Sequence, residues 1–342
     1  MFAFCGPTEY IARVRSHDAA CAGTAWSGER MPIIKHVLVA IRLATLWLAC
    51  STPSVAYAQA SGDQAAAGSI SLGARGGVSA DFRPQGTQPQ EHADDAFGYN
   101  LGAGIASDYI YRGVTLSDHQ PAMGAAFEAR FGKFYTGSTI TSVILPTAPA
   151  AELSFSSGVR PSLSGFDFDL GMTYFLYPGE IGGANTDYVE FSARADRKLT
   201  ERLRVAAGFA YSPNVSNTGA WSKYAAAGIG LDLPVSDILR DVTASFTTSA
   251  GYFWFGNQSA ALGGFPLPAY ATWNAGVTFT HNHLHLDLRY YDTNLSRENC
   301  FVFTGDPNAR PGGRPDPLTN PEGLTSGWCS ATVVAKFWFT LE

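Results

Sequence analysis

Apolar and polar residues alternate with a period of two from Tyr99 onward, and the pattern returns in one run after another. Successive side chains of a β-strand point to opposite faces, so this alternation predicts strands with one apolar and one polar face. The clearest run covers 166–174, where large apolar side chains alternate with Asp167, Asp169 and Thr173. Counting all such runs, including a β-branched one at 133–144, predicts an all-β chain of about twelve strands.

The connections between these runs alternate in length. Gly132-Lys133 and 281–282 are short, whereas 256–267 and 293–327 are long. Bacterial outer-membrane barrels combine short periplasmic turns, longer outer loops and an even number of strands. The runs also reach the ~9–11 residues that a tilted strand needs to cross a bilayer. We therefore expect a transmembrane up-and-down antiparallel β-barrel with its apolar face toward lipid.

A soluble, lipocalin-like barrel is the alternative fold, with its apolar face turned inward. It usually has about eight strands, fewer than the runs counted in this chain. In a transmembrane barrel, aromatic side chains gather at the two membrane interfaces. The residues that we expect there, near the strand ends, are Tyr109, Tyr111, Tyr174, Tyr177, Tyr252, Trp254, Phe337 and Phe339.

Residues 1–58 have the pattern of an N-terminal extension followed by a signal peptide. After Met31 come basic residues and then the apolar run 43–50, and Ala56-Tyr57-Ala58 forms an A-x-A cleavage site. We expect translation to start at Met31 and cleavage to follow Ala58. The next segment, 59–97, is rich in Gly, Ala, Ser, Gln and Asp, which predicts a flexible linker. Residues 98–342 then form the barrel.

The charge balance and the cysteines restrict the partners and the compartment. The net charge is −6 and no basic cluster is present, which argues against nucleic acid as a partner. Only Cys300 and Cys329 follow the predicted cleavage site. An oxidising periplasm favours a disulfide between such a pair, and this bridge would tie the last outer loop.

Charged residues on the polar faces of the runs are the candidates for lining a pore. Asp108 and Arg112 lie four residues apart on one predicted strand, where a structural ion pair or a turn-anchoring arginine is the alternative role. For the whole set, the alternative is a packed, salt-bridged interior. The mixed signs predict no preference for cations or anions. The candidates are Asp108, Arg112, Glu128, Arg130, Glu152, Arg160, Asp167, Asp169, Glu190, Arg194, Arg202, Arg204, Asp287 and Arg289.

Metal binding and catalysis find little support in the sequence. His281, His283 and His285 have a spacing that could chelate zinc, copper or nickel. They straddle a tight turn, however, so we expect solvated histidines and neither metal nor cofactor. No G-x-S-x-G or H-E-x-x-H motif occurs. His119, beside Asp118, is expected only to meet solvent, and we expect a protein that is not an enzyme.

Several short motifs follow one another in the barrel region. They include S-D-Y-x-x-R-G at Ser107 to Gly113, Tyr177-Pro178-Gly179, and Tyr291-Asp292-Thr293. With these motifs, nearly all of 98–342 resembles the TorF family of putative porins, a proteobacterial family of unknown function. The resemblance implies an outer-membrane barrel and leaves the solute open.

The sequence therefore predicts a porin-like channel that passes small solutes through the outer membrane of a Gram-negative bacterium. Its expected partners are outer-membrane lipid, the solutes and the barrel-assembly machinery. A closed structural or adhesive barrel is the alternative function, followed by an outer-membrane enzyme of the lipase, protease or lipid A hydrolase kind.

Overall fold

The structure, a computed structural model, describes residues 97–235 and 241–341. The predicted signal peptide and nearly all of the predicted linker lie outside these residues. Phe97, expected to be the last linker residue, is already the first residue of a strand.

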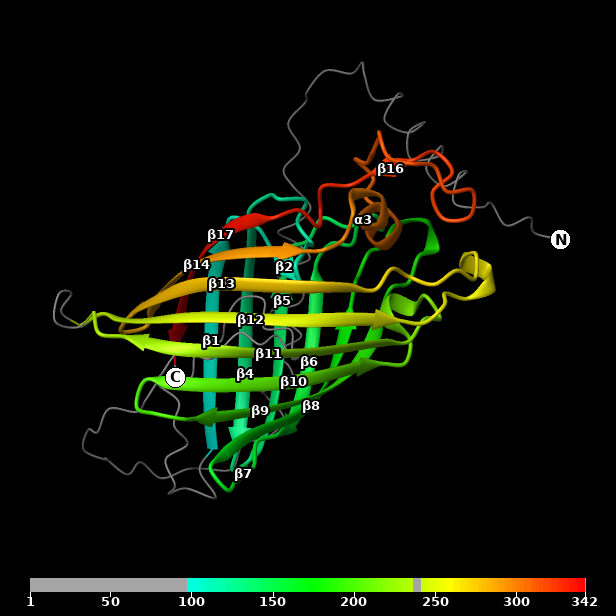
Figure 1. The fold of residues 1–342 in the computed structure, drawn as a ribbon. Coiled ribbons are helices and arrows are strands. Elements are labelled where there is room, and N and C mark those ends of the chain that lie inside the picture. Colours follow the sequence, from blue (N-terminus) through cyan, green and yellow to red (C-terminus); the bar gives the residue numbers. More distant parts are fainter. Residues whose placement is uncertain (1–96, 236–240, 342) are drawn as a thin grey trace, which may run out of the picture. The chain divides into compact units, whose positions relative to one another are not determined.

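Long antiparallel strands close into one barrel of twelve strands, as predicted (Figure 1). Each pairs with the next along the chain, and the ring closes where the first pairs with the last, with Gly104 opposite Trp338. The strands are β1 (Phe97–Ala106), β4 (Ala122–Phe131), β5 (Phe134–Thr141), β6 (Glu152–Val159), β8 (Phe166–Leu176), β9 (Tyr188–Lys198), β10 (Leu203–Ser212), β11 (Ser222–Leu233), β12 (Thr243–Phe255), β13 (Tyr270–His281), β14 (Leu284–Thr293) and β17 (Thr332–Leu341).

Shorter elements lie in the connections. A small hairpin, β2 (Ile110–Tyr111) and β3 (Val114–Thr115), follows β1, and β7 (Ser162–Leu163) pairs with the start of β8. The connection after β14 holds α3 (Arg297–Thr304), β15 (Arg310–Pro311) and β16 (Leu324–Thr325). Three turns of 3₁₀ helix complete the set: η1 (Ile181–Gly183), η2 (Val215–Asn217) and η3 (Ala260–Leu262). Within the described ranges, no helix has the length and apolar character needed to cross a bilayer.

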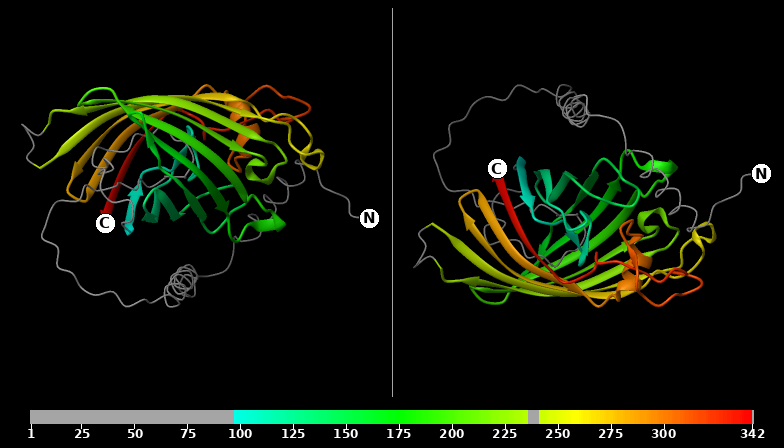
Figure 2. Two further views of the ribbon diagram at one scale, coloured as in Figure 1. Left: turned by 90° about the horizontal axis from the view of Figure 1, so that it is seen from below. Right: turned by 90° about the horizontal axis from the view of Figure 1, so that it is seen from above.

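The connections divide the barrel into two ends. Turns such as 132–133 and 282–283 join strands at what we call the short-turn end, and segments such as 256–269 and 294–331 join them at the long-loop end. Views at right angles to Figure 1 show the sheet curving round, with the segment after β14 at one end of it (Figure 2). The predicted alternation of connection lengths is confirmed except at 234–242, which is as long as the connection 213–221 at the other end.

The polarity of the barrel wall is the reverse of that of a soluble domain. On β8, Leu170 is 44% exposed on the outer surface, while Thr173 and Phe175 are fully buried. Large apolar side chains are exposed in the same way on the other strands, including Leu101, Phe127, Phe155, Phe209, Leu288 and Phe337. The predicted assignment of apolar residues to the outer face is confirmed for these strands.

Three details of the sequence prediction are wrong. β1 ends at Ala106, so Asp108 and Arg112 do not share a strand. The last strand begins at Thr332 rather than at 328. Of the residues expected at the interfaces, Tyr109 and Tyr177 are buried and Tyr111 is half-buried, because all three turn toward carboxylates inside the barrel.

Candidate functional site

The candidate site is the barrel interior, and its most distinctive part is a segment that folds into it from the long-loop end. We call residues 107–121 the inward hairpin. It leaves β1 at Ser107, whose backbone N–H donates to the carbonyl of Ala335 on β17. The buried Asp108 carboxylate then accepts hydrogen bonds from Thr115 Oγ1 at 2.6 Å and from Ser117 Oγ at 2.9 Å. A buried carboxylate needs such donors, and here they fold the segment back on itself.

Arg112, at the tip of the inward hairpin, reaches across the barrel to Glu190 on β9. Both terminal nitrogens of the guanidinium donate to the two carboxylate oxygens, each at 2.9 Å. Bidentate pairing of this kind gives both strength and directional specificity. Burial lowers the pKa of the Arg112 guanidinium, but the charge and hydrogen bonds of Glu190 outweigh it, so this pKa lies above its ordinary value. Arg112 is therefore permanently charged.

Aromatic rings surround this buried guanidinium. Its central carbon lies 4.2 Å from the ring centre of Tyr224 on β11 and 4.6 Å from that of Phe253 on β12. The ring centre of Tyr111, in the hairpin itself, also lies 4.6 Å from this carbon. Cations over aromatic faces are attracted by the ring quadrupole, most strongly when water is excluded. We call Glu190, Tyr224 and Phe253 the Glu190 cage.

Two further contacts position the inward hairpin. Glu152 on β6 accepts hydrogen bonds from the hydroxyls of Tyr109 and Tyr177, both at 2.8 Å. Gly113 has φ +84°, and a Cβ there would collide with Thr293 Cγ2 and Thr272 Oγ1. The hairpin thus contacts β6, β9, β13 and β14 at once, and only glycine fits at position 113.

A cluster of apolar side chains fills the neighbouring part of the long-loop end. Phe175 and Tyr188 stack with ring centres 4.7 Å apart, and Phe253 meets Phe255 at 4.2 Å and Tyr270 at 5.8 Å. The alternation rule does not predict this cluster. Its signal is the stretch 252–255, Tyr-Phe-Trp-Phe, which is aromatic on both faces, so an inner aromatic patch could have been expected there.

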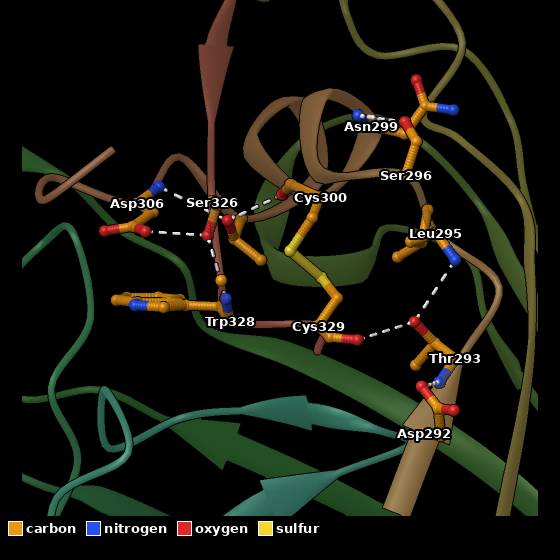
Figure 3. Close-up of a disulfide and its surroundings, with 12 residues drawn as sticks. Asp292, Thr293, Leu295, Ser296, Asn299, Cys300, Asp306, Ser326, Trp328 and Cys329 are labelled. Atoms are coloured by element: carbon orange, nitrogen blue, oxygen red, sulfur yellow. Dashed lines mark hydrogen bonds between the residues drawn. A yellow bond between two sulfur atoms is a disulfide. The ribbon is translucent and has the colours of Figure 1, made fainter. Parts of the chain in front are cut away.

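The long connection 294–331, which we call the cap loop, is joined to the barrel and to the inward hairpin. The predicted disulfide Cys300–Cys329 is present, with Cα atoms 5.8 Å apart, and Thr293 Oγ1 donates to the carbonyl of Cys329 (Figure 3). The disulfide ties α3, whose N-cap residue is Ser296, to the entry of β17. The cap loop is therefore an ordered structure fixed at both ends.

Asp118 and His119 connect the inward hairpin to the cap loop, so the expectation that they only meet solvent is wrong. Asp118 accepts from the indole nitrogen of Trp328 at 2.7 Å and from the side-chain amide of Asn308 at 3.0 Å. His119 Nδ1 lies 2.8 Å from Asp108 Oδ2, and its Nε2 lies 3.1 Å from the carbonyl oxygen of Gly327. The hydrogen bond to Asp108 raises the pKa of His119, against the lowering effect of burial.

A second charged network lies nearer the short-turn end. Arg160, just past the end of β6, donates to both carboxylate oxygens of Glu128 at 2.6 and 2.8 Å and to Asp169 at 3.0 Å. The Tyr135 hydroxyl donates to Asp169 at 2.8 Å, and its ring lies under the guanidinium at 3.8 Å. Arg130 approaches Glu128 at 3.9 Å. Three strands and the turn after β6 thus contribute to one interior network of mixed charge.

The remaining candidates fall into three groups. Arg194, Arg204, Asp287 and Arg289 lie on inward positions of their strands, with Arg194 paired to Asp196 at 2.7 Å and Arg289 to Asp287 at 3.0 Å. Asp167 is exposed at the short-turn end and accepts from Ser162. Arg202 lies in the exposed turn before β10, so its predicted place on a strand is wrong. Sequence reasoning missed the inward positions Asp196, Asp232 and Lys336.

The three histidines near the turn after β13 do not form a set. His285 is buried inside the barrel, stacked on Trp338 at 4.9 Å and 3.2 Å from Thr340 Oγ1, so its predicted solvation is wrong. His281 lies at the exposed turn, where Nδ1 contacts the carbonyl of Asp241. In the part of the chain that the structure describes, no group of three or more His, Cys, Asp or Glu side chains could hold a metal ion.

The motifs noted in the sequence converge on the long-loop end. Ser107 to Gly113 forms the first part of the inward hairpin, Tyr177 donates a hydrogen bond to Glu152, and Thr293 donates one to the cap loop. Residues 90–310 match the family model Gcw_chp, described as a bacterial protein of unknown function. The chain belongs to this family. The TorF name is not confirmed by this match.

Comparison with solved structures finds outer-membrane barrels at low identity. The chain is similar to the NanC porin (8% identity, TM-score 0.40) and to the KdgM porin (8%, TM-score 0.38), covering 72% of this chain and 100% of each of those chains. It is also similar to OmpT, an outer membrane protein of Vibrio cholerae, at 6% identity and TM-score 0.33, covering 73% of this chain and 100% of that chain. No curated protein matches the sequence.

Proposed function

We propose that this protein is a porin-like channel of the outer membrane that passes small polar solutes. The observation that carries the proposal is the reversed polarity of the wall, with exposed Leu170 and Phe127 outside and the Arg160 network inside. An apolar outer surface on a closed barrel suits lipid, because no strand edge is left to expose unpaired backbone groups. A charged interior suits water and polar solutes.

The two ends of the interior supply different parts of such a channel. The network around Arg160 would line a wet passage of mixed charge, so we expect weak selectivity between cations and anions. The inward hairpin would form the constriction, because Arg112 spans the interior from the β1 side to β9.

A second function is favoured by a specific observation. The aromatic cluster and the inward hairpin occupy much of the long-loop end, and the cap loop is bonded to the hairpin through Asp118 and His119. A barrel filled in this way could be closed and serve a structural or adhesive role. The hairpin contacts described above are therefore also the main argument against an open channel.

Conductance of the purified full chain in planar lipid bilayers decides between these functions. We expect discrete current steps in salt, and swelling of liposomes that contain the protein in solutions of small sugars. The folded fraction is established first, since a closed barrel migrates differently in SDS before and after boiling. Heat-modifiable protein that never conducts and never permits swelling would make the closed barrel the correct function.

A further inference from the structure

The Glu190 cage has the composition of a recognition site for a planar cation. A carboxylate binds the edge of the guanidinium through two parallel hydrogen bonds, while the ring centres of Tyr224 and Phe253 lie 4.2 and 4.6 Å from its central carbon. These are the two interactions by which proteins distinguish guanidinium from ammonium. The occupant in the structure is the protein's own Arg112.

Buried hydroxyls lie on strands near that of Glu190, at the same end of the barrel. Thr173 on β8 lies opposite Glu190 in the strand register, and Ser212 on β10 lies opposite Ser222 on β11. The side-chain oxygens of these three residues are buried and, among the described residues, have no hydrogen-bond partner, as is also true of Arg112 Nε. Buried polar groups are nearly always satisfied, so this part of the interior has polar capacity that Arg112 does not use.

The occupant is attached by a short hairpin that other contacts also hold in place. Tyr109 on Glu152 and the turn around Asp108 do not depend on Arg112. The Arg112 side chain is therefore present at the cage at a high effective concentration, as for any tethered ligand. In the native protein, a free guanidinium compound therefore competes poorly with the Arg112 side chain for the cage. Once this side chain is shortened, the cage is open to the free compound.

We propose that the Glu190 cage is a binding site for guanidinium compounds, which Arg112 occupies as an internal competitor. The conductance part of this inference rests on the proposed channel function. In such a channel, Arg112 bound in the cage would close the constriction. Solutes that carry a guanidinium group are the chemical class that the cage recognises.

Isothermal titration calorimetry in detergent tests the site without any reference to transport. The protein is Arg112→Ala, checked for heat modifiability, and the probe is methylguanidinium chloride at millimolar concentration. We expect one site per barrel in Arg112→Ala and no measurable binding to the native chain. The neutral isostere methylurea and the compact cation methylammonium should bind at least about tenfold more weakly, since each lacks one of the two interactions.

Three control variants keep the test decisive. The double variant Arg112→Ala/Glu190→Gln preserves the cage shape without its charge, and we expect methylguanidinium affinity to fall at least about tenfold. Arg310→Ala removes a cation from an exposed residue of the cap loop and should leave the native lack of binding unchanged. If Arg112→Ala does not assemble, Arg112→Gln replaces it, because it keeps a longer stem with amide donors.

Conductance then links the site to the channel. Arg112→Ala should conduct more than the native chain, and methylguanidinium should reduce that conductance while methylurea should not. Equal binding by Arg112→Ala and its Glu190→Gln derivative, or equal binding of methylguanidinium and methylurea, overturns the site. If Arg112→Ala binds methylguanidinium but never conducts, the proposed binding site stands and the proposed channel function is wrong. If it conducts but does not bind methylguanidinium, the channel function stands and the binding site is wrong.

Discussion

The barrel contains two bidentate Arg–Glu pairs, one near each end, and they differ mainly in their access to water. At the long-loop end, the side chains of Arg112 and Glu190 are 2% and 1% exposed. Those of Arg160 and Glu128, toward the short-turn end, are 22% and 21% exposed. The same kind of ion pair is thus shielded from water at the long-loop end and partly hydrated toward the short-turn end. Removing one partner should be costly only where water cannot replace it.

Glu190→Ala should have the largest effect and tests the comparison directly. It leaves a buried guanidinium without its carboxylate, and we expect a loss of about 3–5 kcal/mol in the free energy of unfolding. The matched change Glu128→Ala should lose only about 1 kcal/mol, because water reaches Arg160 and Asp169 remains. Urea unfolding of both variants in detergent micelles measures this, and equal losses would contradict the distinction between the two ends.

Removing the disulfide tests whether the cap loop contributes to the rigidity of the long-loop end. In the chain-entropy model, Cys300→Ser with Cys329→Ser should lower stability by roughly 3.5 kcal/mol. The double variant should also be cut by the Glu-specific protease Glu-C in the cap loop, where Glu322 is exposed, faster than the oxidised protein. Dithiothreitol should bring the native chain to the same cleavage rate. Mass spectrometry that found both native thiols free to alkylate would remove this prediction.

Neighbouring substitutions on β8 test the assignment of inside and outside on which the comparison depends. Leu170→Arg places a cation on the apolar outer face and should cost roughly 2–4 kcal/mol if it lies near the bilayer midplane. Asp169→Asn keeps an acceptor oxygen for Tyr135 and Arg160 and should be mild. The heat-modifiable fraction in outer membranes reports the result, and the opposite order would reverse the two faces.

The smallest expected effect concerns pH and the contact between the inward hairpin and the cap loop. The folded-state pKa of His119 is raised, so its contribution is complete below the unfolded value of about 6.5 and is lost as pH rises through the folded value. Because the His119 side chain is 37% exposed, solvent screening keeps this contribution below about 1 kcal/mol.

The measurement is the rate at which Glu-C cleaves the cap loop of the native chain after Glu322, relative to His119→Asn at each pH. The native loop should be better protected than the variant at pH 6, and the advantage should shrink toward pH 9. Since both proteins meet the same protease at the same pH, the ratio is independent of the protease's own pH profile. A constant ratio would show that His119 does not titrate in this contact.

The strands of the barrel could be predicted because each obeys one local rule. Along β8, alternation assigns Leu170 and Asp169 to opposite faces, since neighbouring side chains of a strand must face opposite sides. The strand number and the connection lengths, typical of an outer-membrane barrel, then predict that the apolar face is outside. The disulfide could also be predicted, because only Cys300 and Cys329 follow the predicted cleavage site.

The inward hairpin could not be predicted by the same rule. Tyr109, Tyr111 and Arg112 continue the period of two, yet the chain turns where Asp108 binds Thr115 and Ser117. Three hydrogen-bonding residues within a short segment and the glycine at 113 are the local signs of that turn. That Arg112 meets Glu190, on the sixth barrel strand, depends on the diameter and closure of the whole ring, which no local pattern contains.

One pairing in this barrel differs from the others in the sequence separation of its two strands. All strand pairs except β1–β17 join neighbours along the chain, so their loop-closure entropy is small and they can form in sequence. Joining β1 to β17 brings together segments from opposite ends of the described chain. Until that step, the growing sheet carries two exposed edges that invite aggregation. We expect ring closure to be the slow last step of assembly and the open sheet to be the species that needs protection.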